Sequence, residues 1–348
     1  MDRVYFENHL PVGGFVWIEN LEENSILPDA ARPPFITYKN NDCLCKVIHP
    51  LEKNPLLYRE LANLYPSKEN ITSFAKKYGL LRRENGEIID KHKNVFKPAC
   101  SYSTWIESII EMHCMVFLLD LIKNEDDVLA SKILHITENG QCALVSAIIP
   151  VERIGLDWYK DLVKIWPDFM NGDDSKVGQY QKKYPDVLSL CFWNTTKRGI
   201  EVLKHLFRFP WEEEVYKKLK ALDNSVEFLR YLMLRKISEV YENGLSVKFL
   251  VDIDTKVKSS SIGVEKYLVP EDLYTALFVQ LEMEILNTRE LRQCEYCGDW
   301  FIATDKRQKY CPEFIKVVNP YTGEVKKVPT GKHCKVYAYR QKNKGIPS

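Results

Sequence analysis

Four cysteines near the C-terminus have the residue type and the spacing of a metal site. Cys294 and Cys297 form a Cys-x-x-Cys turn, and Cys311 and Cys334 follow later in the chain. A turn of this kind directs two thiolates toward one centre, and zinc at structural sites takes four tetrahedral nitrogen or sulfur ligands. Gly298, directly after the second thiolate, suits the tight backbone of such a turn. We therefore predict that the four cysteines bind Zn2+.

Two alternatives stay open for this site. His333 directly precedes Cys334 and could replace it as the fourth ligand. The Cys-x-x-Cys pair could also be a redox pair, with Cys311 and Cys334 as ordinary buried thiols. The following residues favour zinc, because Trp300 and Phe301 begin a short apolar strand that suits a finger hairpin better than an oxidoreductase. We expect these two aromatic side chains to form the small core of the finger.

Charge is distributed unevenly along the chain, although the net charge of the whole is only +1. Residues 289–348 hold 13 Lys/Arg and 6 Asp/Glu, which gives +7. The preceding 288 residues hold 36 basic and 42 acidic residues, which gives −6. A basic end on an acidic body indicates a terminus that faces a polyanion.

Ten basic residues of this end are candidate contacts to DNA or RNA. They lie before the third cysteine, in the segment before the fourth cysteine, and in a predicted basic helix that begins there. Such a helix can contact phosphates or enter a groove. The alternative is that these side chains only solvate a small exposed module. The ten candidates are Lys306, Arg307, Lys309, Lys326, Lys327, Lys332, Lys335, Arg340, Lys342 and Lys344.

Length and composition indicate a cytoplasmic protein without a membrane span. The chain has 348 residues, 45% of them hydrophobic, which is enough for a large core and two or three structural units. The N-terminus lacks the pattern of an export signal. The longest strongly apolar run, residues 114–119, is far shorter than the roughly 18 residues that a span requires.

Catalysis is not expected from the motifs of this chain. The sequence contains no Gly-rich phosphate loop, no His-Glu-x-x-His and no Gly-x-Ser-x-Gly. A zinc ion bound by four thiolates also has no open position at which to activate water. We predict that the protein is not an enzyme.

Apolar periodicity predicts a mainly helical region before the cysteines. Ser67 is a candidate N-cap of a helix that stops at Gly79, and a central helix is expected over about 103–122. His113 lies within the latter and is expected to be a core residue rather than a ligand. Strands are predicted at 15–18, at 35–38, over 245–251 and as a hairpin within 132–150.

Three motifs near the C-terminus and two in the body match a known pattern. These are Cys294-x-x-Cys297-Gly298-x-Trp300-Phe301, Arg307-Gln308-Lys309-Tyr310-Cys311, Cys334 followed by Tyr339-Arg340-Gln341-Lys342, Pro55-Leu56-Leu57-Tyr58-x-x-Leu61-Ala62, and Ile71-x-x-Phe74-Ala75-x-x-Tyr78-Gly79-Leu80-Leu81. The first three resemble the CGNR-type zinc finger. This treble-clef-like module stands at the C-terminus of bacterial proteins predicted to be transcription regulators. The body motifs resemble the ABATE-like helical domain that precedes that finger.

The chain departs from the family pattern in two places. The Cys-Gly-Asn-Arg tetrapeptide that names the family is absent, since Cys334 is followed by Lys-Val-Tyr. About twenty residues, 313–332, also intervene between the last two cysteines, and their composition predicts an inserted β-hairpin with a turn at 319–323. Because of these departures, the resemblance supports zinc binding more strongly than it supports nucleic-acid binding.

These observations predict an α+β fold with a predominantly helical body and a small C-terminal zinc finger. We expect a body over 1–265, a connecting helix docked on it within 266–292, and the finger over 293–348. Pro270 is expected in the first turn of that helix. The predicted function is a zinc-finger nucleic-acid-binding protein that regulates transcription, with the basic C-terminal finger contacting DNA. The alternative is a structural or protein-interaction module on a body that binds an effector or a partner protein.

Overall fold

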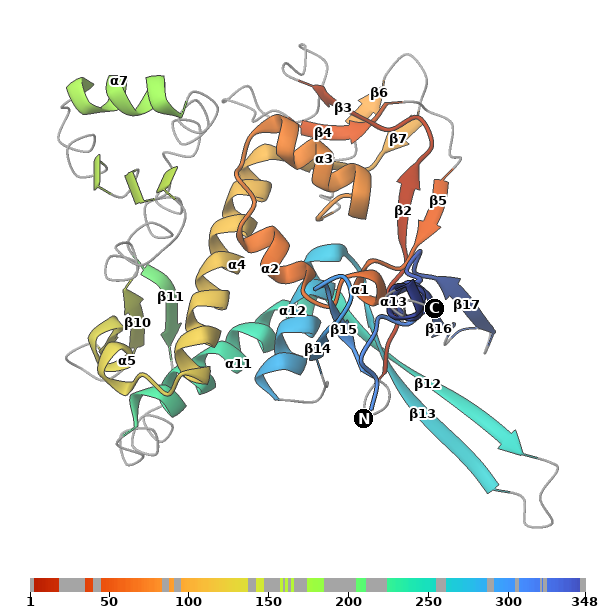
Figure 1. Cartoon of the computed structure of the whole chain (residues 1–348). Helices are drawn as coiled ribbons and strands as arrows, with labels where there is room; N and C mark the ends of the chain where they lie inside the picture. The colour runs from red at the N-terminus through yellow and green to blue at the C-terminus, as the bar shows by residue number, and fades with distance from the viewer. Residues whose placement is uncertain are drawn as a thin grey trace. The chain divides into compact units, whose positions relative to one another are not determined.

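Helices and small sheets alternate along the chain in the computed structural model (Figure 1). The mixed helix-and-sheet class agrees with the prediction, and a cysteine cluster lies near the C-terminus. The structure describes residues 3–18, 35–39, 45–82, 88–90, 95–136, 142–146, 157–158, 160–161, 164–165, 174–184, 205–210, 224–254, 261–286, 291–303, 307–319, 321 and 324–344.

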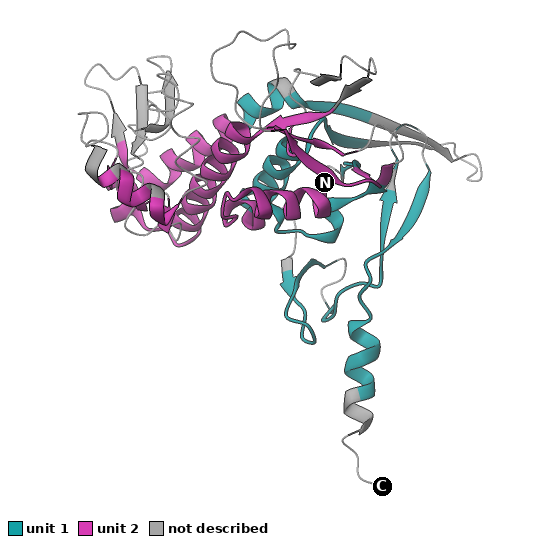
Figure 2. Cartoon of the chain, turned by 90° about the horizontal axis from the view of Figure 1, so that it is seen from above, with its two compact units in different colours: residues 1–9, 47–58, 237–348 teal, residues 10–46, 59–236 magenta. Residues whose placement is uncertain are grey.

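The chain divides into two compact units, each built from separate stretches of sequence (Figure 2). Unit 1 contains residues 1–9, 47–58 and 237–348, and unit 2 contains residues 10–46 and 59–236. The stretch predicted as the body, residues 1–265, contributes to both units. The cysteine cluster belongs to unit 1.

Unit 2 contains the long helix α4 (Tyr102–Lys123), which confirms the helix predicted over about 103–122. The Ser101 side chain caps it by accepting a hydrogen bond from the backbone N–H of Thr104. The other elements within unit 2 are β3 (Phe15–Ile18), β4 (Phe35–Tyr38), α3 (Lys68–Tyr78), β6 (Ile88–Asp90), β7 (Val95–Lys97), β8 (Ala99–Ser101), α5 (Asp127–Ile133), β9 (Leu134–Ile136), β10 (Cys142–Ser146), α7 (Asp174–Lys183) and β11 (His205–Pro210). Residues of both units occur in β2 (Asn8–Pro11), β5 (Cys45–Ile48), α2 (Leu57–Ala62) and α11 (Ser225–Gly244).

The predicted ends of α3 and the predicted core position of His113 are confirmed in unit 2. Ser67 caps α3 by accepting from the N–H of Asn70, and Gly79 follows the helix with a positive φ of 93°. His113 is buried in α4, and its Nδ1 lies 3.0 Å from the carbonyl oxygen of Ala62. This histidine is therefore a core residue with a backbone partner, as expected.

The predicted strands of unit 2 are also present. β3 pairs antiparallel with β4, which pairs in turn with β8. β9 and β10 form the antiparallel pair expected within 132–150, and β11 extends it on the other side of β10. The helix α5, which ends at Ile133, was not predicted.

Unit 1 is built on a three-stranded sheet whose central strand is β13 (Ser261–Pro270). β13 pairs parallel with β1 (Arg3–Val4) and antiparallel with β12 (Leu245–Asp254). Successive side chains of a strand point to opposite faces. Leu268 accordingly packs with Val279 and Met283 of helix α12 (Leu273–Ile285), while its neighbours Tyr267 and Val269 belong to a different apolar cluster.

The connecting helix is shorter than the predicted segment 266–292, because its first residues belong to β13. Pro270 ends that strand and is not in the first turn of the helix. Asp272 is the N-cap, and its side chain accepts from the N–H of Thr275 at 2.7 Å. Proline has no backbone N–H and can stand at the end of a strand as well as in the first turn of a helix. Pro270 alone therefore did not identify where the helix begins. Unit 1 also contains the short helix α1 (Pro50–Lys53), and the side-chain amide of Gln280 in α12 donates to the backbone carbonyls of Leu51 and Asn54.

The segment between the last two cysteines contains two paired strands, β16 (Phe314–Val318) and β17 (Val325–Pro329). Val317 of β16 is buried together with Tyr5, Tyr267 and Val269. Tyr321 makes an edge contact with Tyr5, with ring centroids 6.5 Å apart. The two strands therefore rest on the face of the β1–β13–β12 sheet opposite to α12. None of the helices that the structure describes is both long and apolar enough to cross a membrane.

Candidate metal centre

A short strand pair positions the first two cysteines. β14 (Leu291–Gln293) pairs antiparallel with β15 (Trp300–Ile302), and the loop between these strands carries Cys294 and Cys297. The N–H of Cys294 donates to the carbonyl of Asp299, and the N–H of Gly298 donates to the carbonyl of Cys294 at 3.0 Å. Gly298 has a φ of 76°, the left-handed conformation that glycine adopts most easily. We call residues 291–344, which include this loop, the metal module.

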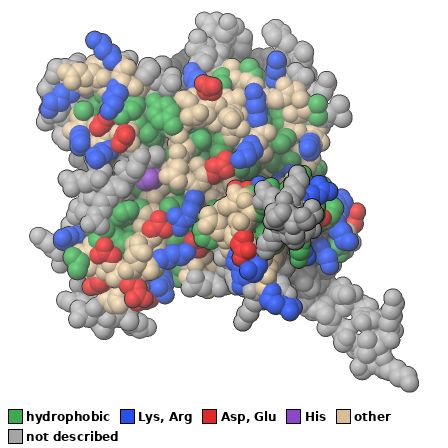
Figure 3. All heavy atoms as spheres, viewed as in Figure 1, with side chains coloured by type: hydrophobic (Ala, Val, Ile, Leu, Met, Phe, Trp, Pro, Cys, Tyr) green, Lys and Arg blue, Asp and Glu red, His purple; other side chains and the backbone are tan. Residues whose placement is uncertain are grey.

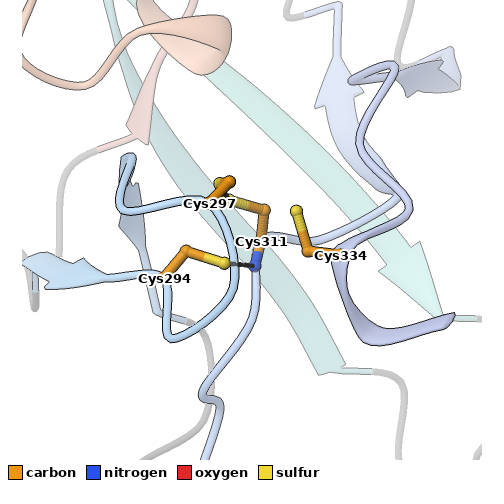
Figure 4. A group of neighbouring side chains, drawn as sticks. All are labelled: Cys294, Cys297, Cys311 and Cys334. Atoms are coloured by element: carbon orange, nitrogen blue, oxygen red, sulfur yellow. Dashed lines mark hydrogen bonds between the residues drawn. The ribbon is translucent and has the colours of Figure 1, made fainter. Parts of the chain in front are cut away.

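The other two cysteines come from different elements. Cys311 lies just before β16, and its segment is joined to the first loop by a hydrogen bond from the N–H of Glu295 to the carbonyl of Lys309. Cys334 is the first residue of helix α13 (Cys334–Lys344). The four side chains point toward a common centre (Figure 4).

The distances between the sulfur atoms fit one tetrahedral metal ion. All four Sγ atoms lie within 4.8 Å of one another. Those of Cys297 and Cys311 are 3.7 Å apart. A tetrahedral ion with metal–sulfur bonds of about 2.3 Å places its sulfur ligands about 3.8 Å apart. The backbone N–H of Cys311 also donates to Sγ of Cys294 at 3.5 Å, which is the kind of contact that orients a thiolate ligand.

The thiols of Cys294, Cys311 and Cys334 differ in pKa because their surroundings differ. Burial raises the pKa of Cys294, but backbone hydrogen bonds from Cys297, Cys311 and Tyr296 outweigh it and lower that pKa to about 7. Burial, and then the sulfurs of Cys297 and Cys294, raise the pKa of Cys334 to about 11. The same causes raise the pKa of Cys311 well above its usual range. Thiolates this close repel one another, so four of them together require a cation.

His333 is not part of the cluster. Its side chain is exposed, with Nδ1 3.6 Å from a carboxylate oxygen of Glu313, and the group that could hold a metal contains Cys334. The expectation that Trp300 shares the finger core with Phe301 is wrong. Phe301 is buried among the cysteines, whereas Trp300 is 47% exposed, because neighbouring residues of a strand face opposite sides.

Three of the predicted basic contacts are engaged within the module. Each of these lysines lies beside a carboxylate of the same module, so its charge is partly balanced there. The pairs are Lys309–Glu295 at 3.0 Å, Lys326–Glu324 at 3.3 Å and Lys332–Asp299.

The other seven predicted basic residues either are exposed or have side chains that the structure does not describe. Arg307, Lys327, Lys335 and Arg340 are exposed. Lys306 lies outside the described residues, and the side chains of Lys342 and Lys344 are likewise not described, although their backbone belongs to α13. On the face drawn in Figure 3, Lys and Arg side chains gather over the region where Figure 1 draws α13 and β17.

Sequence reasoning missed one exposed cation, Lys316 of β16, which lies directly opposite Lys327 of β17. Alternation along β16 could have identified it, because Ile315 and Val317 face the sheet and Lys316 must then face away. Within the described part of the module, no acidic side chain pairs with Lys316, Lys327, Lys335 or Arg340.

The cluster has the donor set of a closed metal site. Thiolate sulfur is a soft donor, and four such donors complete a tetrahedral coordination sphere. Three of the cysteines, Cys294, Cys311 and Cys334, are buried around Phe301, while Cys297 is exposed. The assignment of a metal site rests on this geometry and chemistry. Comparisons with protein families, with curated proteins and with solved structures find no match to this chain.

Proposed function

We propose that the cluster binds one Zn2+ ion and that residues 291–344 form a treble-clef-like zinc finger of the CGNR type with an inserted β-hairpin. Four thiolates at this spacing are one of the ligand sets that structural zinc sites use. The site is closed, so it has no open position for a water molecule, and we propose no catalytic role.

Zinc would supply much of the folding energy of this module. Its own apolar core is small, with Phe301 packed among the cysteines. Structural zinc in small fingers contributes roughly 10–16 kcal/mol at neutral pH, which is enough to order a segment with so little buried apolar surface. The ion would also hold α13 next to the first loop, because Cys334 is the first residue of that helix.

We further propose that the protein is a cytoplasmic, bacterial nucleic-acid-binding regulator whose metal module contacts DNA. One observation carries this proposal. Lys316, Lys327, Lys335 and Arg340 are exposed on the module and have no acidic partner among the described residues. Unpaired cations on a rigid scaffold are suited to phosphate oxygens, which form most protein contacts with DNA.

The salt dependence of binding tests this proposal. Four phosphate contacts on duplex DNA predict that log affinity falls with log salt with a slope of about −3.6, from about −0.9 per contact. The full chain, loaded with zinc, would be titrated into a labelled duplex at several salt concentrations. No binding to any polyanion at about 50 mM salt would exclude the proposal.

A second function is favoured by a different observation. Val317 of the module is buried with Tyr267 and Val269 of the sheet, so the metal module also supports unit 1. The module would then be a structural staple, or a protein-interaction element, on a region that binds an effector or a partner protein. In this case zinc removal would destabilise unit 1, while no polyanion would bind at low salt.

A further inference from the structure

An exposed pair of aromatic rings lies beside the metal centre. Tyr296 and Tyr337 are stacked, with ring centroids 5.9 Å apart and an interplanar angle of 26°. Each remains well exposed, Tyr296 by 38% and Tyr337 by 45%. The edge of the pair is extended by His333, whose ring centroid lies 6.3 Å from that of Tyr337 at 88°. The module therefore presents a continuous aromatic surface to solvent.

The metal ligands fix the position of this surface. Tyr296 stands between Cys294 and Cys297 in the first loop, and Tyr337 lies one helical turn after Cys334. The cysteine cluster brings the loop and α13 close together, and the two rings meet beside it. Rings that are already ordered lose little conformational freedom when a flat ligand stacks on them.

Positive charge lies next to the rings. Arg340 is three residues after Tyr337 in α13, which places it on the same side of the helix. Lys335, also exposed, is two residues before Tyr337 and therefore lies on a different side of the helix. Neither Lys335 nor Arg340 has an acidic partner in the part of the chain that the structure describes. A ligand for this surface would therefore combine flat aromatic groups with negative charge.

Single-stranded nucleic acid has this combination, whereas duplex DNA does not offer its bases. In a duplex the faces of the bases are covered by neighbouring bases, and only their edges reach the grooves. In a single strand the bases can leave the stack and lie on aromatic side chains, while the phosphates meet Lys and Arg.

We propose that Tyr296 and Tyr337 form a stacking platform for an unpaired base of single-stranded DNA or RNA, with Arg340 on an adjacent phosphate. The proposal rests on the proposed function, because it assumes that the metal module contacts nucleic acid. It adds that part of the affinity comes from bases rather than from phosphates alone.

A comparison of two probes separates base stacking from charge. The zinc-loaded full chain would be titrated with a single-stranded oligonucleotide of about 10 nucleotides and with an abasic sugar-phosphate oligomer of the same length and charge. We expect the abasic oligomer to bind at least about fivefold more weakly, since stacking of one base is lost. DNA and RNA versions of the first probe distinguish the two sugars.

Variants of the tyrosines make the test specific. Tyr337→Ala is expected to weaken binding of the oligonucleotide by about fivefold or more and to leave the abasic oligomer unchanged. Tyr337→Phe keeps the ring and should bind like the parent protein. Tyr339→Ala removes another exposed tyrosine of α13, 59% exposed but outside the stacked pair, and should have little effect. The zinc content of each variant would be measured to show that the module is folded.

Each outcome decides the proposal. Equal affinity for the normal and the abasic oligomer, or tighter binding of a duplex than of the single strand, would overturn the stacking platform and leave the nucleic-acid proposal standing. No binding of any probe at about 50 mM salt would overturn both.

Discussion

Lys316 of β16 and Lys327 of β17 lie directly opposite one another in the antiparallel ladder, and both side chains are exposed. Like charges in this position are unfavourable for a strand pair. The strands tolerate the pair because their other face is held on the sheet of unit 1 by Val317. A bound polyanion would turn this repulsion into a pair of favourable contacts.

Replacement of both lysines by glutamine tests this interpretation. Lys316→Gln with Lys327→Gln removes the repulsion, so stability should be unchanged or higher by less than about 1 kcal/mol in urea unfolding. The slope of log affinity against log salt for duplex DNA should become shallower by about 1.8, since two phosphate contacts are lost. Lys326→Gln is the matched control, because Lys326 is already paired with Glu324, and it should change the slope less. An unaltered slope in the double variant would remove these lysines from the interface.

The metal site is tested by Cys311→Ser. The protein as purified should contain one zinc ion per chain in elemental analysis, and this variant should lose most of it because a tetrahedral ligand is missing. The metal module should then lose its order, since its apolar core is small. Cys45→Ser is the control, because Cys45 lies outside the cluster, and it should keep the metal. Iron in place of zinc would correct the identity of the ion, and full metal content in Cys311→Ser would contradict the site.

The buried histidine of α4 predicts a dependence of stability on pH. Burial lowers the pKa of His113 below its usual value of 6.5, and the hydrogen bond to the carbonyl of Ala62 only partly offsets this. The unfolded chain therefore binds a proton at higher pH than the folded chain does. The contribution of neutral, buried His113 to the free energy of unfolding is fully present above pH 6.5 and is lost progressively as the pH falls below that value.

His113→Gln removes the titrating group and so separates this contribution from other effects of acid. Urea unfolding at several pH values between about 5 and 8 should show a smaller loss of stability toward low pH in this variant than in the parent protein. His333→Gln, which replaces an exposed histidine, should keep the dependence of the parent. Identical pH profiles for the parent and His113→Gln would contradict the prediction.

The contact between the metal module and the sheet of unit 1 is tested by Val317→Ala. Val317 is 5% exposed and shares a buried cluster with Tyr267 and Val269, so the truncation should lower the free energy of unfolding by about 1–3 kcal/mol. Val325→Ala is the control on the facing strand, because Val325 is 58% exposed, and it should change stability by less than about 0.5 kcal/mol. Equal effects of the two variants would show that β16 and β17 do not depend on this contact.

The sequence by itself predicted the features that depend on neighbouring residues. The spacing of Cys294 and Cys297, with Gly298 after them, specifies a tight turn that directs both thiolates to one side. Ser67 and Gly79 mark the ends of α3, since capping hydrogen bonds and a left-handed backbone act within one turn of a helix. These signals are local, so no long-range contact is needed to interpret them.

Only the tertiary structure decided which side chains meet across long distances in the chain. The balance of Lys332 by Asp299, the exposure of Trp300 and the stacking of Tyr296 on Tyr337 were not predicted. Each depends on which loops the four cysteines bring together and on which face of a strand is covered. Composition fixes how much charge and apolar surface the module carries, but packing determines which cations and rings remain free for a partner.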